Sequence, residues 1–341
     1  MKIRLLTDRN IAPNRIKAGE IIDLHDDIAL RWIEAGIARP EMETGTAEHT
    51  EIEHPKVSII ILVKDALPYF KKCIESIIKY THNYELIIVD NDSKKETKDY
   101  IKSLDINYTL ITNDENKGFS YGNNQGIKVA KSDYICFLNS DTVVTPNWIG
   151  LLMKGLELPE AGAVGPSTCF CSSKQMLRAY TRYRGKDMPY PVNPPEGYEE
   201  FIYPDYLIGF CVLVKKEVLD KIGGFDHHSF PLILGEDVDF SVRVARAGYK
   251  LYWVKNCYIH HYGHASIYEA QLDANKISIN TRPALKANID SNKIKIDNDV
   301  EIKNIDYITN RVVYTANIGD YDNIIEWDKL EHGIYFTDMA N

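Results

Sequence analysis

Four short apolar runs alternate with helical patterns between residues 57 and 138, and this alternation constrains the fold more than any other feature. The runs lie in KVSIIILVK, YELIIVDNDS, NYTLITND and SDYICFLNSD. A parallel strand that helices cover on both faces is apolar throughout, whereas a half-exposed strand alternates. Strand–helix repeats of this length need right-handed crossovers. The sequence therefore predicts an α/β fold with a doubly wound, mainly parallel sheet.

The chain divides into four parts by composition. Residues 1–40 read as a small α+β module, with strands in KIRLLTD and GEIIDL and an amphipathic helix in HDDIALRWIEAGIARP. Residues 41–54 are polar and acidic, as in a linker. Residues 55–285 hold the strand–helix repeats, and residues 286–341 read as a linker and the opening strands of a further, truncated domain.

Charge and cysteine usage exclude several classes of protein. A net charge of −9 argues against a nucleic-acid binder. The six cysteines lie mostly in apolar runs, which predicts buried thiols in a reducing compartment, hence the cytoplasm. VSIIILV (57–63) is far shorter than the roughly 20 residues of a membrane helix, which leaves peripheral membrane association open. Residues 1–40 are too small for a site, and we expect docking or homo-oligomerisation there.

Polar side chains follow the predicted strands at the points where the strands end. Asp65 follows the first, Asp90 and Asp92 the second, and Asn139-Ser140-Asp141 the fourth. In doubly wound sheets ligands bind beyond the carboxyl ends of the strands, so these side chains should face one crevice. The alternative is that the acids cap the following helices, and for Asp92 this alternative has equal weight.

Residues 56–265 resemble the large family 2 of inverting, GT-A-fold glycosyltransferases. The resemblance rests on motifs in order: IIVDNDS, NKGFSYGNNQGI, YICFLNSDT, GGFD, GEDVDFSVRVARAGY and a strand that ends in histidine. It implies transfer of a sugar from a nucleotide diphosphate. The Q-x-x-R-W motif and membrane helices of processive members are missing from the sequence, which favours addition of a single sugar.

The resemblance implies a nucleotide cradle at the ends of the first strands. Asp65, Asp90 and Asp92 would accept the base N–H or the ribose hydroxyls, and the family comparison points most strongly to Asp90. Asn124 would lie near the nucleotide or sugar, with a turn residue as the alternative. Asn139 and Ser140 stand where the family carries an acid-x-acid triplet, and Asn139 would contact ribose or a metal-bound water.

Asp141 is the candidate ligand for Mn²⁺ or Mg²⁺, because these cations prefer oxygen ligands and bind through few carboxylates plus substrate phosphates. The resemblance aligns His261 with a histidine of the metal shell. In an extended segment His260 and His261 point in opposite directions, so only one of them faces the crevice. We expect His260 to pack elsewhere, and His264 to be either a ligand or a surface residue.

The general base is expected in GEDVDFSVRVARAGY. The family places its catalytic acid at Asp237, with Glu236 beside it to bind the acceptor or position the loop. Asp237 falls in the first turn of a predicted helix, where the helix dipole favours an ionised carboxylate. Asp239 and Arg243, four residues apart, are expected to pair on the helix surface.

These predictions combine into one function. The chain is expected to be a metal-dependent inverting glycosyltransferase that moves one sugar from a UDP- or dTDP-sugar to a hydroxyl of a glycan or glycoconjugate. The alternatives are an inactive nucleotide-sugar or glycan-binding module and a nucleotidyltransferase. The latter needs a glycine-rich phosphate loop after the first strand, which LVKDALPY does not supply.

Overall fold

The structure is a computed structural model of the 341-residue chain. It describes residues 2–5, 9–11, 14–17, 21–23, 38–40, 52–177, 185–187, 201–202, 204–263, 274–300, 304–308 and 311–315. The predicted helix within residues 25–40 falls largely outside these ranges, as do His264, most of the predicted linker 41–54 and most of the loop 171–206.

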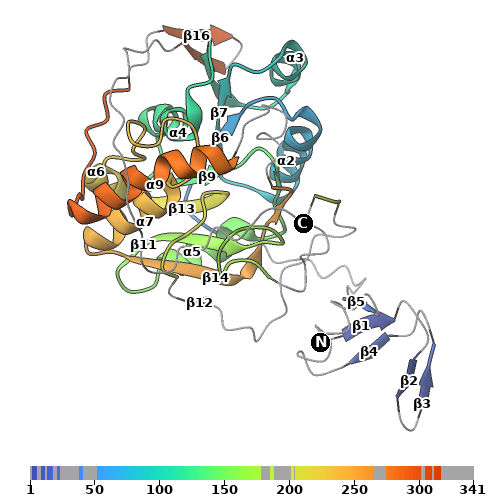
Figure 1. The fold of residues 1–341 in the computed structure, drawn as a ribbon. Helices are drawn as coiled ribbons and strands as arrows, with labels where there is room; N and C mark the ends of the chain where they lie inside the picture. The colour runs from blue at the N-terminus through green and yellow to red at the C-terminus, as the bar shows by residue number, and fades with distance from the viewer. Residues whose placement is uncertain are drawn as a thin grey trace.

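The main sheet contains ten strands in the order β12-β14-β11-β13-β9-β6-β7-β8-β17-β16 (Figure 1). In chain order they are β6 (Val57–Val63), β7 (Tyr84–Asn91), β8 (Tyr108–Asn113), β9 (Tyr134–Leu138), β11 (Ala161–Ser167), β12 (Phe201–Ile202), β13 (Cys211–Lys215), β14 (Lys250–Tyr258), β16 (Asn304–Ile308) and β17 (Arg311–Thr315).

Strands β9, β6, β7 and β8 are parallel neighbours, so their carboxyl ends lie along one edge of the sheet. β13 runs antiparallel between β9 and β11. A separate two-stranded ribbon joins β10 (Thr142–Val143) to β15 (His260–His261). The predicted α/β class with a mainly parallel sheet is confirmed.

Helices cover both faces of this sheet. They are α2 (Leu67–Tyr80), α3 (Lys95–Ser103), α4 (Gly118–Val129), α5 (Trp148–Leu156), α6 (Lys216–Ile222), α7 (Glu236–Arg246) and α9 (Ala274–Asp290). Ile59 and Ile61 of β6 pack with residues of α2, α3 and α5, whereas Ile60 packs with residues of α6 and α7. Figure 1 shows α2 and α4 on opposite sides of β6 and β7. This two-sided cover explains why the strand is apolar throughout.

The two ends of the chain add small strands. β1 (Lys2–Leu5), β4 (Ile21–Asp23) and β5 (Ala38–Pro40) form one sheet, and β2 (Arg9–Ile11) pairs with β3 (Asn14–Ile16). Residues 38–40 are therefore a strand where a helix end was predicted. β17 pairs in parallel with β8, so residues 311–315 extend the main sheet, and α9 spans the predicted boundary at residue 285. The further domain predicted for residues 286–341 stays a prediction, because most of it lies outside the described residues.

Strand β11 was not predicted. Its sequence AGAVGPS carries two glycines and a proline, which are depleted in strands, yet it is buried along its whole length. It pairs in parallel with β14 and antiparallel with β13. Tertiary pairing therefore outweighs weak local propensity at this position.

Gly118 fixes the start of α4 against the loop that leads to α7. Its φ is +78°, and a Cβ there would lie 1.9 Å from the carbonyl oxygen of Pro231. The next residue, Phe119, donates its N–H to the carbonyl of Leu232 at 2.7 Å. The contact needs a residue without a side chain and with left-handed backbone.

We expect Gly118→Ala to destabilise the fold by more than about 3 kcal/mol, because left-handed strain adds to a backbone clash. Gly248→Ala is the matched control: its φ is +91° with no atom within 4 Å of an added Cβ. It should cost only about 1–2 kcal/mol from the backbone. Urea unfolding of both variants measures the difference, and equal losses would show that the contact with Pro231 is unimportant.

Candidate active site

Asp141 and His261 form the centre of the candidate site. β10 pairs antiparallel with β15 so that Thr142 lies opposite His261. The Nε2 atom of His261 lies 3.3 Å from Oδ1 of Asp141, and both side chains are nearly buried. The backbone N–H of Tyr262 also donates to the carbonyl of Asp141 at 3.0 Å. A short ribbon thus brings together two residues that are distant in sequence.

The ring of His261 is held from two other sides. Its Nδ1 lies 3.0 Å from the carbonyl oxygen of Phe170, the geometry of a ring N–H that donates to that carbonyl. The ring of Phe210 stacks on it with centroids 5.1 Å apart. Burial would lower the pKa of His261, but the charge and hydrogen bond of Asp141 and the Phe170 carbonyl raise it overall. The tautomer with a proton on Nδ1 leaves Nε2 available as a ligand.

The Asp141–His261 pair fits a divalent cation. Ligand atoms about 2.1 Å from an ion lie roughly 3.0–3.4 Å apart, and the observed separation of 3.3 Å falls in that range. The pair would supply two protein ligands. His264, the third predicted ligand, lies outside the described residues. The role of Asp141 as a metal ligand stays a prediction, and its separation of 3.3 Å from His261 suits that role.

Gly209 and Phe210 connect this pair to the predicted base. The N–H of Gly209 donates to Oδ2 of Asp237 at 3.3 Å. The carbonyl of Phe210 accepts the N–H of Asn139 at 2.9 Å, while its ring stacks on His261. The two residues that precede β13 therefore place Asp237 beside the strand end that carries Asp141. Sequence reasoning missed this junction, because LIGFCVLV read only as a strand.

Glu236 and Asp237 stand in the first turn of α7, after Gly235 in left-handed backbone. Asp237 is half-buried and accepts N–H groups of Val238 and Gly209 at 2.8 and 3.3 Å. Burial nevertheless raises the pKa of Asp237, so the predicted effect of the helix dipole is outweighed. A carboxylate with a raised pKa is a stronger base, which suits proton removal near neutral pH.

Glu236 is buried more deeply than its neighbour. Its Oε2 has no hydrogen-bond partner among the described residues. Burial, and secondarily the charge of Asp237, raise the pKa of Glu236 well above its ordinary value. A buried, unpaired carboxyl oxygen costs free energy unless it is protonated or meets a ligand.

Asp65 and Asp90 are buried and make hydrogen bonds within the fold. Oδ1 of Asp65 accepts the N–H of Lys94, the residue before α3, at 2.6 Å. Oδ1 of Asp90 accepts the N–H of Ser93 at 2.9 Å, and burial raises the pKa of Asp90. Each carboxylate uses one oxygen to shape the loop after β7, so the capping role is present whether or not either residue also binds a nucleotide.

Asp92 is half-buried and lies among lysines. Its carboxylate is 3.7 Å from the Nζ of Lys64 and 3.6 Å from that of Lys98. It forms no side-chain cap on α3. Lys64 also lies 3.6 Å from Asp65, so its charge offsets the acids at the ends of β6 and β7. Donor binding by Asp92 stays a prediction.

Asn139 and Ser140 occupy the strand end before Asp141. Asn139 is half-buried, and its side chain makes no hydrogen bond to a residue that the structure describes. Its carbonyl accepts the hydroxyl of Thr142 at 2.8 Å, which tightens the turn. Ser140 is buried. The Asn139 amide is thus available for the predicted contact with ribose or a metal-bound water.

Asn124 makes hydrogen bonds within the fold through both ends of its amide. The side chain is fully buried; its Nδ2 donates to the carbonyl of Phe225 at 2.7 Å and its Oδ1 accepts the N–H of Phe225 at 2.9 Å. Both polar ends of the amide therefore hold the GGFD loop against α4. This pairing gives Asn124 a structural role, and the donor contact that the resemblance implies stays a prediction.

A buried network of amides lies next to the predicted cradle and was also missed. Asn113 exchanges two hydrogen bonds of 2.9 Å with Gln125 and donates to Asn91 at 3.1 Å. Asn91 in turn donates to Asn116 at 2.8 Å and accepts the N–H of Lys117. The network joins the ends of β7 and β8 to the start of α4. The sequence signal was the pair of asparagines that end these strands.

His260 packs away from the Asp141–His261 pair, as its extended segment predicts. Its Nδ1 lies 3.3 Å from the sulfur of Cys169 and 3.1 Å from the hydroxyl of Tyr258. Burial lowers the pKa of His260 to about 4, although the hydrogen bond to the Lys186 carbonyl acts in the opposite direction. The ring is therefore neutral at physiological pH and structural.

Comparison with known proteins indicates a family of glycosyltransferases. Residues 58–223 match the model of glycosyl transferase family 2. The O-antigen biosynthesis protein RfbC of Myxococcus xanthus is 27% identical over 226 residues, which cover 62% of this chain and 18% of RfbC. The rhamnosyltransferase WbbL of Escherichia coli is 24% identical over 231 residues, which cover 61% of this chain and 84% of WbbL.

Among solved structures, the mannosyltransferase PcManGT from Pyrobaculum calidifontis, in complex with GDP-Man and Mn²⁺, aligns with a TM-score of 0.47 and 16% identity. The alignment covers 69% of this chain and 67% of that one. The family match and the observed sheet topology confirm the predicted GT-A fold.

The raised pKa of Glu236 predicts a pH dependence of stability. Above pH 4.5, the ordinary value for this group, the unfolded chain loses a proton that the folded chain keeps. The free energy of unfolding should therefore fall as the pH rises toward the folded-state pKa. Glu236→Gln removes this titration. Between pH 4.5 and pH 8, the free energy of unfolding of the variant should therefore rise by at least about 1 kcal/mol relative to that of the wild type.

Glu217→Gln is the control, because Glu217 is an exposed glutamate in the first turn of α6. Chemical denaturation at several pH values measures both variants. A stability difference between Glu236→Gln and the wild type that is constant from pH 4.5 to 8 would contradict the assigned burial of the charge.

Proposed function

Because this chain belongs to glycosyl transferase family 2, we propose that it moves one sugar from a UDP- or dTDP-sugar to a hydroxyl of a glycan or glycoconjugate, with inversion. The observation that carries the proposal is the junction at Gly209 and Phe210, which sets a half-buried carboxylate beside the Asp141–His261 pair. Two relatives, an O-antigen biosynthesis protein and a rhamnosyltransferase, support an acceptor of this class.

The chemistry needs a base and a stabilised leaving group. The Asp237 carboxylate accepts the proton of the acceptor hydroxyl as that oxygen attacks the anomeric carbon. The bond from this carbon to the diphosphate oxygen breaks in the same step, and the nucleoside diphosphate leaves from the opposite face. One displacement inverts the anomeric configuration, and no covalent sugar–enzyme bond forms.

Asp141 Oδ1 and His261 Nε2 would hold Mn²⁺ or Mg²⁺, which supplies Lewis-acid stabilisation of the charge on the departing diphosphate. The stacked ring of Phe210 and the Phe170 carbonyl keep the imidazole oriented for this role. Glu236, with a buried oxygen that lacks a protein partner, is proposed to contact the acceptor.

The rival enzyme class is less well supported. A nucleotidyltransferase would need a cation after β6 that is available for phosphates, but Lys64 lies within 3.7 Å of both Asp65 and Asp92. No helix in the described ranges is long and apolar enough to cross a bilayer. Cytoplasmic location, peripheral membrane association and self-association through residues 1–40 stay predictions.

Asp237→Asn tests the base. The first step is a screen of nucleotide sugars for donor hydrolysis, which identifies the donor. With that donor, Asp237→Asn should lower kcat for transfer by about 10²–10⁴-fold, because the amide cannot accept the proton. Donor affinity should change by less than about threefold. Asp220→Asn, an exposed acid on α6, is the control and should keep full activity. Full turnover by Asp237→Asn would remove it as the base.

Asp141→Asn and chelation test the metal claim. EDTA should abolish transfer, and added Mn²⁺ or Mg²⁺ should restore it. Calorimetry with UDP and Mn²⁺ should show at least about tenfold weaker binding in Asp141→Asn, since one of the cation's charged ligands is lost. In EDTA the two proteins should bind UDP alike. Asp105→Asn, exposed after α3, is the control. Retained activity in EDTA would overturn the metal dependence.

A further inference from the structure

A second group of potential metal ligands lies in the loop between α6 and α7. His227, His228 and Asp299 each offer one ligand atom, and these atoms all lie within 4.8 Å of one another. Within the described ranges this is the one group of three His, Cys, Asp or Glu side chains with that property. It shares no residue with the Asp141–His261 pair, and the predicted site residues do not include it.

A turn brings the two neighbouring imidazoles to one side. In an extended segment adjacent side chains point in opposite directions, as His260 and His261 do. Here Oδ1 of Asp226 accepts the N–H groups of His228 at 3.2 Å and Ser229 at 3.0 Å, which curls the backbone. The rings of His227 and His228 consequently lie with centroids 4.0 Å apart.

Both rings direct Nε2 at one oxygen. Nε2 of His227 lies 3.0 Å and Nε2 of His228 lies 3.3 Å from Oδ1 of Asp299. Nitrogen and oxygen ligands about 2.0–2.1 Å from a tetrahedral Zn²⁺ are separated by about 3.3–3.4 Å, so only a small adjustment would bring the three atoms around one ion. Asp299 and His228 are exposed, which leaves the remaining coordination position open to water.

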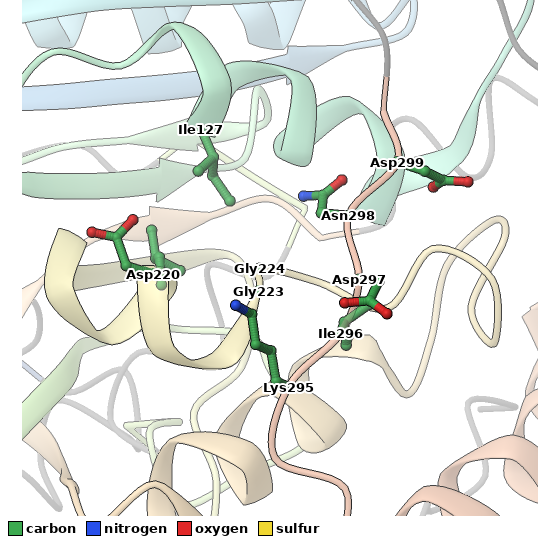
Figure 2. Close-up of a pocket in the computed structure, with 10 residues that line it drawn as sticks. Ile127, Asp220, Gly223, Gly224, Lys295, Ile296, Asp297, Asn298 and Asp299 are labelled. Atoms are coloured by element: carbon green, nitrogen blue, oxygen red, sulfur yellow. The ribbon is translucent and has the colours of Figure 1, made fainter.

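His227 and the segment that carries Asp299 are held by packing. His227 is buried, and its ring meets that of Tyr121 on α4 edge to face. Asp299 follows Ile296, whose N–H donates to the carbonyl of Ile222 at 3.0 Å, and precedes the buried Val300. A pocket of about 450 Å³ lies beside Gly223 and Gly224. Figure 2 shows residues 295–299 passing this pocket, with Lys295 and Asp299 at opposite ends of the segment.

We propose that His227, His228 and Asp299 bind a transition-metal ion of the Zn²⁺ type, which fastens residues 295–299 to the loop that leads to Asp237. Two imidazoles and a carboxylate form a common donor set for Zn²⁺. The ion would link the segment after α9 to the loop that also contacts Gly118. It would thereby stabilise the loop that leads to α7, the helix that carries the predicted base. The proposal goes beyond glycosyl transfer and does not depend on it.

The test uses the full chain in an Asp141→Asn background, so that the predicted catalytic site has lost its carboxylate. Co²⁺ is titrated into chelator-treated protein and followed by visible absorption, and Zn²⁺ then displaces it. We expect one Co²⁺ bound per chain with the intense bands of a four-coordinate site. His228→Gln and Asp299→Asn should each weaken binding by at least tenfold. Both residues are exposed, so these variants should fold.

Asp297→Asn is the matched control, because Asp297 is an exposed acid on the same segment and lies outside the cluster. It should bind Co²⁺ as the parent does, and Zn²⁺ should raise the Tm of the parent and of this control only. The proposal is overturned if the parent binds no Co²⁺, if His228→Gln and Asp299→Asn keep the parent's affinity, or if Asp297→Asn loses as much as Asp299→Asn.

Discussion

The pairing of β10 with β15 is the constraint on which the candidate site depends. These two-residue strands lie opposite each other outside the main sheet, and their register sets Thr142 against His261. Without this pairing Asp141 would be a lone acid at a strand end, a common and unspecific feature. With it, the carboxylate gains an oriented imidazole at 3.3 Å, and Phe210 then fixes the ring from the side of β13.

Burial gives the acids their different chemical characters. Asp65 and Asp90 use carboxylate oxygens to cap backbone N–H groups of the loop after β7. Asp237 also accepts two N–H groups, yet burial still raises its pKa, and Glu236 beside it keeps an oxygen without a partner among the described residues. A native fold tolerates such an unsatisfied group where a ligand completes it, which is why these two acids are the better candidates for chemistry.

Much of the sheet could be predicted from the sequence, because β6, β7, β8 and β9 are apolar runs whose pattern follows directly from cover on both faces. β11 could not, since only its pairing with β13 and β14 makes AGAVGPS a strand. The conjunction of Asp141 with His261 was predicted through family resemblance, and no local pattern contains it.

Tertiary contacts decide the surroundings of other side chains, which the sequence pattern does not predict. Asn124 uses both ends of its amide on Phe225, a residue that no local pattern relates to it. Asp239 and Arg243 do pair at 2.7 Å, but the pair is buried under α9, where Asn288 also donates to Asp239. The helical period predicts the spacing of such a pair, whereas only the docking of α9 decides whether it faces solvent.

The central claim is a single displacement at the anomeric carbon, assisted by Asp237 and by the Asp141–His261 pair. The most direct test is the anomeric configuration of the product, read by proton NMR from a reaction with the donor that the enzyme accepts. The account predicts the configuration opposite to that of the donor, from the first turnover onward. A product that retains the donor's configuration would contradict it, because retention requires a different mechanism from one base-assisted displacement.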